Sequence, residues 1–254
     1  MRSLLILLKK ELKQYFFTPF GWIVLTIIIL LQGFSVSAVL EAYESKPVGT
    51  NMLLDSFSAG GVFYIYFLFL FPLLTMKLFS EEERSGTMET LMTAPIRTWQ
   101  VVFSKYIAAL SFYCFLWLPL ILHIKIFTWV TGTPAPASQE HFIGVFCILF
   151  LIGTFFIAIG CLASAITSSQ IIAAILTFGM ILAHVFVGFI PSMMGESFRI
   201  AAGAQFFHYI AAHEHLSSFG IGLLDSRAFV YYLSMAAFTL LVTHHVVDYR
   251  RWKN

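Results

Sequence analysis

Three histidines and one carboxylate gather in one stretch of an otherwise apolar sequence. His208, His213 and His215 lie within eight residues of one another, and Glu214 stands between the last two. Imidazole and carboxylate groups at this spacing could coordinate zinc or copper. The alternative is that these histidines lie on an interfacial amphipathic helix. No neighbouring cysteine or further carboxylate completes a ligand set, so we expect no metal site in this chain.

Sequence patterns of common catalytic sites do not occur. The chain has no Gly-x-x-x-x-Gly-Lys-Ser/Thr loop for nucleotide phosphates, no His-Glu-x-x-His and no Gly-x-Ser-x-Gly. Its long apolar segments contain no Asp or Glu, which argues against a proton-coupled pump or an intramembrane aspartyl protease. We therefore predict a chain that is not an enzyme and binds no cofactor, so that energy for any transport has to come from a separate ATPase.

The composition indicates a membrane protein. Of the 254 residues, 59% are hydrophobic and only 11% are charged, whereas a soluble domain has roughly 25% charged residues. The net charge of +2 is too small to suggest a surface for nucleic acids. Cys114, Cys147 and Cys161 lie inside apolar runs, so they indicate neither a disulfide framework nor a metal site.

Apolar segments of the length needed to cross a bilayer, roughly 20 residues, recur along the chain. We predict an all-α membrane protein, a single transmembrane domain over residues 1–254, with transmembrane helices at residues 20–40, 57–78, 106–127, 142–166, 171–190 and 228–247. The runs are continuous rather than alternating, which excludes barrel strands. The first run is too long for a signal-peptide core and follows a charged segment, which argues against a cleaved leader.

Lysine and arginine residues predict the orientation. Six spans place both termini on one side, and that side would carry 11 of the Lys and Arg residues against 4 on the other. We therefore expect both termini and the loop 80–105 to be cytoplasmic, and the protein to lie in the bacterial inner membrane. The outer loop 191–227 is rich in apolar residues, and we expect one or two short helices there, at the outer leaflet.

Residues 1–18 are predicted to form an amphipathic helix. Leucines recur at helical spacing from Leu4 to Leu12, followed by Tyr15, and Lys9, Lys10 and Lys13 stand between them. Such a helix lies in the interface, with its apolar side in the lipid and its basic side toward anionic headgroups. The alternative is a positively charged segment that merely anchors the orientation.

The loop 80–105 contains the signals of short helices. Ser80 and Glu83 fit a capping box, and Gly86 permits a sharp turn. Pro95 disfavours helix at the residue before it, so a second short helix should end there. This helix would expose Leu91 and Met92 to water, which suggests docking into the groove of a partner. The alternative is a charged connection that only sets the topology.

The small residues of the fourth predicted span indicate close helix packing. They are Gly153, Ala158, Gly160, Cys161 and Ser164, followed by Ser168. Two interpretations stay open, a seam between two copies of the chain and ordinary packing within one chain. The polar residues Thr167–Gln170 then form a second, very short inner connection.

Three parts of the sequence resemble ABC-2-type transporter permeases. Phe79–Pro95, followed by Val101–Lys105, resembles the family's loop signature, and the N-terminal segment from Lys10 to Gly21 is similar to its elbow. The stretch from His215 to Tyr232 resembles the last third of the gliding-motility and nitrous-oxide-reductase-maturation permeases. The resemblance covers nearly the whole chain. Ser104 replaces the glycine that it leads us to expect before Lys105.

The resemblance implies the membrane-spanning subunit of an ABC exporter. Two permease copies or paralogues would pair as a dimer and dock on two separate ATPase subunits, which would bind ATP and Mg. The residues implied for coupling are Glu82, Glu83, Arg84, Gly86, Thr87, Glu89, Leu91 and Pro95, to which we add Ser168 and Gln170 of the second inner connection. The outer loop would resemble extracellular gate helices, with Phe206, Tyr209, Phe219, Gly220 and Asp225 as candidates. The alternative is an ATP-driven anchor of a motility or assembly machine that moves no cargo.

Overall fold

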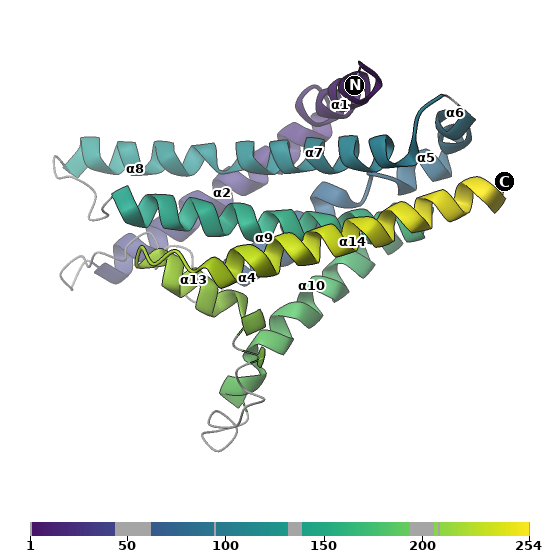
Figure 1. Cartoon of the computed structure of the whole chain (residues 1–254). Helices are drawn as coiled ribbons and strands as arrows, with labels where there is room; N and C mark the ends of the chain where they lie inside the picture. Colours follow the sequence, from purple (N-terminus) through teal and green to yellow (C-terminus); the bar gives the residue numbers. More distant parts are fainter. Residues whose placement is uncertain are drawn as a thin grey trace.

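The described residues of the chain fold into a bundle of α-helices. The computed structural model describes residues 2–43, 62–93, 95–131, 139–193, 206–207 and 209–253 (Figure 1). The helices are α1 Arg2–Phe16, α2 Pro19–Tyr43, α4 Val62–Thr75, α5 Ser80–Arg84, α6 Thr87–Thr93, α7 Thr98–Leu116, α8 Leu118–Thr131, α9 Gln139–Ile166, α10 Gln170–Met193, α13 Ala212–Gly220 and α14 Ser226–Lys253. The prediction of an all-α membrane protein is confirmed.

Five segments of the described residues are long and apolar enough to cross a membrane. They are Pro19–Ser37, Thr98–His123, Ile143–Ile166, Gln170–Ile190 and Ser226–Arg250. The remaining predicted span corresponds to α4, whose apolar part Tyr66–Thr75 is shorter, and residues 57–61 of that prediction lie outside the described ranges. The chain is thus a multi-pass membrane protein, and the number of six spans stays a prediction.

Helix α9 is the centre of the bundle. It contacts α4, α7, α10, α13 and α14, and α14 runs along it in the view of Figure 1. Of its membrane-crossing segment, 78% is buried inside the chain, against 22% for the segments in α2 and α10. The long apolar surfaces of α2 and α10 are therefore the ones left for lipid or for another chain.

Two glycines allow neighbouring helices to approach α9 closely. A Cβ atom at Gly153 would overlap the ring of Tyr113 in α7, and one at Gly160 would overlap the side chain of Thr75, the last residue of α4. Small residues let helices pack at short distance. The small residues of α9 from Gly153 to Ser164 are thus used for packing inside the chain, and the interpretation as a seam between two copies was wrong for them.

Helix α1 packs with one side on the rest of the bundle. It lies along α7 and buries Leu7, Glu11 and Tyr15. The hydroxyl of Tyr15 donates a hydrogen bond of 2.7 Å to the carbonyl of Leu74, and its ring stacks on Phe112 with 4.9 Å between the centroids. The buried side of α1 thus packs on protein, because α7 offers a matching apolar surface, whereas Leu5 and Ile6 are exposed. The interfacial position of this helix stays a prediction.

The third predicted span is built from two helices. The first, α7, begins at Thr98, so the end of the predicted loop 80–105 is helical. At the junction with α8, the N–H of Leu120 bonds to the carbonyl of Trp117 in an i to i+3 pattern, and Pro119 has no N–H to donate. The carbonyl of Leu116 instead accepts a hydrogen bond of 3.1 Å from the side chain of Gln32 in α2.

Candidate functional site

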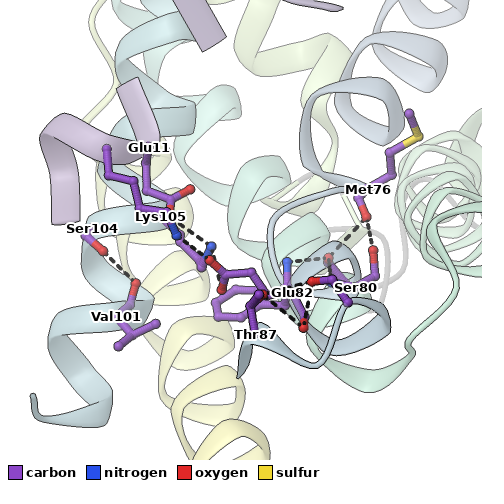
Figure 2. Close-up of polar contacts among 12 residues, drawn as sticks. Glu11, Met76, Ser80, Glu82, Thr87, Val101, Ser104 and Lys105 are labelled. Carbon is purple, nitrogen blue, oxygen red and sulfur yellow. Dashed lines mark hydrogen bonds and ion pairs between the residues drawn. The ribbon is translucent and has the colours of Figure 1, made fainter. Parts of the chain in front are cut away.

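Four charged side chains from three helices meet at one end of the bundle. The Nζ atom of Lys105 lies 3.0 Å from an oxygen of Glu11 and 3.0 Å from an oxygen of Glu82. The Nζ atom of Lys10 lies 2.8 Å from the other oxygen of Glu82. We call these four residues the ionic cluster. They join α1, α5 and α7, and Figure 2 shows the two carboxylates converging on Lys105.

Three of the four side chains of the ionic cluster are deeply buried, and that of Lys10 is about half exposed. The side chains of Lys105, Glu11 and Glu82 are 2%, 4% and 10% exposed, and the ring of Phe79 lies 5.5 Å from the Lys105 ammonium. Burying an ion costs several kcal/mol unless an opposite charge and hydrogen bonds compensate it. Two lysines and two glutamates balance one another here. Because each buried charge depends on its neighbours, the cluster fixes the relative positions of the three helices.

The charges of the cluster also shift one another's protonation. Burial alone would raise the pKa of Glu82, but Lys105 and Lys10 outweigh it and hold this pKa below its usual value. Burial alone would lower the pKa of Lys10, but Glu82 and Glu11 hold it above its usual value. Both groups are therefore charged at neutral pH. An arrangement in which every charge is already paired is suited to holding positions rather than to transferring protons.

The first turn of α5 is capped from another helix. The backbone N–H groups of Phe79 and Ser80 donate hydrogen bonds of 3.0 and 3.1 Å to the hydroxyl of Ser164 in α9. The hydroxyl of Ser80 itself donates to the carbonyl of Met76 (Figure 2). The predicted capping box of Ser80 and Glu83 is therefore wrong. Phe79 precedes the helix with helical backbone angles, and the N–H of Ser80 already donates to Ser164.

A sharp turn at Gly86 leads from α5 to α6, as predicted. Gly86 has φ of +68°, a conformation that residues with a Cβ rarely adopt. The hydroxyl of Thr87 donates to the carbonyl of Glu82 at 3.3 Å and closes the turn. Helix α6 then ends at Thr93, close to the predicted end before Pro95.

Helix α6 exposes fewer apolar side chains than the sequence suggested. Met88 is buried, and Leu91 is partly buried against the hydrophobic core. The expectation that Leu91 stands in water was therefore wrong, because one side of this short helix packs onto the bundle. Glu89 and Thr90 of α6 are exposed, and the side chain of Met92 lies outside the described part of the chain.

The last turns of α14 contact the same region. The guanidinium of Arg250 lies 3.1 Å from a carboxylate oxygen of Glu83 and donates a hydrogen bond of 2.6 Å to the carbonyl of Ile166 at the end of α9. Asp248 accepts a hydrogen bond of 2.8 Å from the hydroxyl of Thr98 at the start of α7. Helix α14 is thereby tied to α5, α7 and α9 at this end.

The residues predicted for coupling differ in exposure. Arg84, Gly86, Thr87, Glu89, Pro95 and Ser168 are exposed, Glu83, Leu91 and Gln170 are partly buried, and Glu82 is buried. Helix α10 contacts α5, so the turn at Ser168 and Gln170 lies at the same end of the bundle as α5. Ser104, where a glycine was expected, lies within α7 and donates to the carbonyl of Val101 (Figure 2), so no turn occurs there.

The residues predicted for an outer gate differ in exposure, and their role as a gate stays a prediction. Phe206 and Tyr209 are exposed, whereas Phe219 and Gly220 of α13 are buried. Asp225 accepts a hydrogen bond of 2.9 Å from the backbone N–H of Arg227 in the first turn of α14. Short helical structure in the outer loop was expected, and α13 provides it.

The outer histidines face aromatic rings. His213 stacks on Phe189 with 4.8 Å between centroids, and Nδ1 of His215 lies 3.4 Å from the hydroxyl of Tyr232 in α14. Burial lowers the pKa of His215. His208 lies outside the described residues. Within the described ranges, no group of three or more His, Cys, Asp or Glu side chains is arranged to hold a metal ion.

Sequence reasoning did not single out Glu11, Lys105, Asp248 and Arg250 as site residues. Their partners are far away in the chain, since 94 residues separate Glu11 from Lys105. The available signal was weak. Glu11 is the only carboxylate on the amphipathic N-terminal helix, and Lys105 directly precedes a long apolar run.

Comparison with known proteins identifies the family. The model of the family described as ABC-2 family transporter protein matches residues 5–217. The matched region includes all of the ionic cluster and the helices α5 and α6. No curated protein matches the sequence. The narrower resemblance to gliding-motility and nitrous-oxide-reductase-maturation permeases stays a prediction. Because the match covers most of the chain, the protein belongs to the ABC-2 family of transporter proteins.

Proposed function

We propose that the chain is the permease subunit of an ABC exporter and that it couples ATP hydrolysis by a separate ATPase to movement of its transmembrane helices. The observation that carries the proposal is the connection of α5 and α6 to the bundle. Glu82 of α5 is held by Lys105 of α7 and Lys10 of α1 through ion pairs of 3.0 and 2.8 Å. A push on this element therefore reaches two other helices without passing through a flexible segment.

The outward side of the same element suits a protein partner. It presents Glu81, Arg84, Glu89 and Thr90 to solvent. Exposed charges of both signs on short helices that are fixed to the bundle favour recognition of a surface with complementary charges. We propose that the ATPase, which carries ATP and Mg, docks here and that the turn at Ser168 borders the contact.

The proposed orientation places this end of the bundle in the cytoplasm of a bacterial cell. In Figure 1, α5, α6 and the C-terminal end of α14 lie together at one end, and α13 lies toward the other. Most lysines and arginines of the chain belong to the first end, which favours the cytoplasmic side of the inner membrane. We also propose that two copies or paralogues pair, and the large exposed apolar surfaces of α2 and α10 leave room for such a contact.

The docking proposal is tested with charge reversals at exposed positions. Arg84→Glu combined with Glu89→Arg should abolish co-purification of the ATPase and its stimulation by the permease, while the permease stays folded. Substitutions at Leu91 are unsuitable, because this side chain packs on the core. Arg227→Gln, at an exposed residue of the outer end, is the control and should change neither result. An intact complex with the double variant would overturn the proposed docking surface.

A further inference from the structure

A groove of about 570 Å³ lies between the beginning of α1 and the start of α7. Its apolar wall is formed by Leu4 and Leu5 of α1 together with Pro95 and Trp99. Arg97 supplies a guanidinium at the same groove. The groove thus combines one fixed positive charge with apolar and aromatic surface, which is the pattern that an amphiphile would match.

An exposed apolar strip continues from this groove along α7. Trp99 and Phe103 are 43% and 44% exposed, and their rings meet edge to face with 6.4 Å between the centroids. On α1, Leu5 and Ile6 are 61% and 69% exposed. Large apolar side chains gathered on one surface indicate contact with a lipid or a partner. Tryptophan in particular is enriched at the level of lipid headgroups, where one part of its ring system is wet and the other is apolar.

The charge at the groove is positive. Among its described lining residues, Arg97 is the one charged side chain, and it is exposed. Lys9 and Lys13, further along α1, are also exposed. Glu11, the only carboxylate of α1, is buried in the ionic cluster. A basic surface of this kind attracts anionic lipids, with about 1 kcal/mol for each Lys or Arg near the membrane.

We propose that this groove binds an anionic phospholipid, with the phosphate at Arg97 and the acyl chains along Trp99 and Phe103. The groove favours a lipid over an ATPase segment for two reasons. Arg97, the charged residue of its lining, is a cation, and the aromatic strip extends from the groove along a membrane-crossing helix. The cytoplasmic leaflet as the source of the lipid rests on the orientation proposed above.

Trp99 itself can report the bound lipid. In a variant that retains Trp99 alone, the other tryptophans are replaced by phenylalanine, namely Trp22, Trp117, Trp129 and Trp252. This variant is placed in nanodiscs that contain brominated phosphatidylglycerol or brominated phosphatidylcholine, since bromine quenches a nearby indole. Both leaflets of a nanodisc are alike and no ATPase is present, so the result depends neither on orientation nor on docking.

Brominated phosphatidylglycerol should quench Trp99 at lower lipid fractions than brominated phosphatidylcholine does. Arg97→Gln should weaken this preference roughly fivefold, the effect of one lost cation near a membrane. Arg84→Gln removes an exposed cation of α5, which does not line the groove, and should leave the preference unchanged. Because Trp117 is buried, retention of phosphatidylglycerol by the chain with all its tryptophans, measured by native mass spectrometry, provides a second readout.

Two results would overturn the proposal. Equal quenching by both lipids would mean that ordinary boundary lipid covers the strip without recognition of a headgroup. Absence of quenching by either lipid would mean that the groove faces water, and protection of Trp99 after addition of the ATPase would then identify a protein occupant. Neither result would affect the proposed docking at α5 and α6, which is tested with other residues.

Discussion

At the end of the bundle that contains α5 and α6, called the inner end after the proposed orientation, three helices meet through buried charges. At the opposite end, called the outer end, α13 meets its neighbours through uncharged rings. Lys105 lies 3.0 Å from both Glu11 and Glu82. At the other end, His215 lies 3.4 Å from the hydroxyl of Tyr232. A buried ion pair loses much of its energy when the charges separate, while ring contacts tolerate small shifts.

The difference teaches how one bundle can be rigid at one end and adaptable at the other. The inner end holds α1, α5 and α7 in one arrangement, as an element that transmits a push has to do. The outer end repeats the looser pattern, since Nδ1 of His184 in α10 also lies 3.4 Å from a hydroxyl, that of Tyr231 in α14. We therefore expect substitutions at the inner end to cost more stability than substitutions at the outer end.

The largest effect is expected from Lys105→Met. It leaves the carboxylate of Glu11 buried without its main partner, which should cost about 3–5 kcal/mol of stability. Thermal unfolding in detergent measures the loss, and Lys9→Met, at an exposed position, is the control. Adding Glu11→Gln to Lys105→Met should restore part of the stability. A Lys105→Met variant as stable as the control would contradict the structural role of the cluster.

A smaller effect is expected from Ser164→Ala. It removes the hydroxyl that accepts hydrogen bonds from the N–H groups of Phe79 and Ser80, and the loss of a helix cap costs about 1–2 kcal/mol. The cost should appear locally, as faster hydrogen exchange in α5 than in the unaltered chain. Ser111→Ala, whose exposed hydroxyl bonds only to the preceding turn of its own helix, is the matched control. Equal exchange in both variants would mean that the cap is dispensable.

At the outer end, Tyr232→Phe should cost less than about 1 kcal/mol. The substitution removes a hydroxyl whose contact with His215 is long, at 3.4 Å, and it keeps the ring contacts. The comparison is sharpened by measuring this variant beside Lys105→Met in one series of thermal unfolding. If Tyr232→Phe were the more destabilising of the two, the contrast between the ends would be reversed.

Mild acid should produce the smallest effect, and only at the outer end. Burial lowers the pKa of His215 below its usual 6.5, so the unfolded chain binds a proton first as the pH falls. This contribution to stability is complete above pH 6.5 and is lost below it. Between pH 7.5 and 5.5, thermal unfolding of the unaltered chain should therefore shift more than that of His215→Gln. Identical shifts would exclude His215 as the titrating group.

The inner end should respond only to stronger acid. Burial opposes the charge of Glu82, but Lys105 and Lys10 outweigh it and keep its pKa below the usual 4.5. Its contribution to stability is therefore present above about pH 4.5 and is lost as the pH falls toward the folded value. The two ends thus differ in their response to acid as well as in the strength of their contacts.

Local patterns in the sequence were enough to predict much of the helical architecture. Continuous apolar runs identify membrane helices, because in lipid the backbone N–H and C=O groups must form hydrogen bonds with one another. Gly86 identifies a turn, because its backbone conformation excludes most other residues. Both signals act over a few residues. The position of Thr98 as the start of α7 was missed, since the spans were predicted from charge-free runs and Lys105 interrupts the run at that point.

The contacts that hold the candidate site were not predictable in the same way. Ser164 caps a helix 84 residues earlier in the chain, and Lys10 pairs with Glu82 across 72 residues. Partial burial of Leu91 and the protein-facing side of α1 depend on which helix happens to lie opposite. Such partners follow from tertiary packing, so a single sequence indicates the residue types without indicating which of them meet.

The cap on α5 also has a consequence for biosynthesis. Because the hydroxyl that completes its first turn belongs to Ser164, a ribosome has to synthesise α9 before α5 can adopt its final form. An ATPase that encounters the nascent chain earlier would meet an unfinished surface. The order of residues along the polypeptide thereby delays the proposed assembly with the ATPase until α9 has been synthesised.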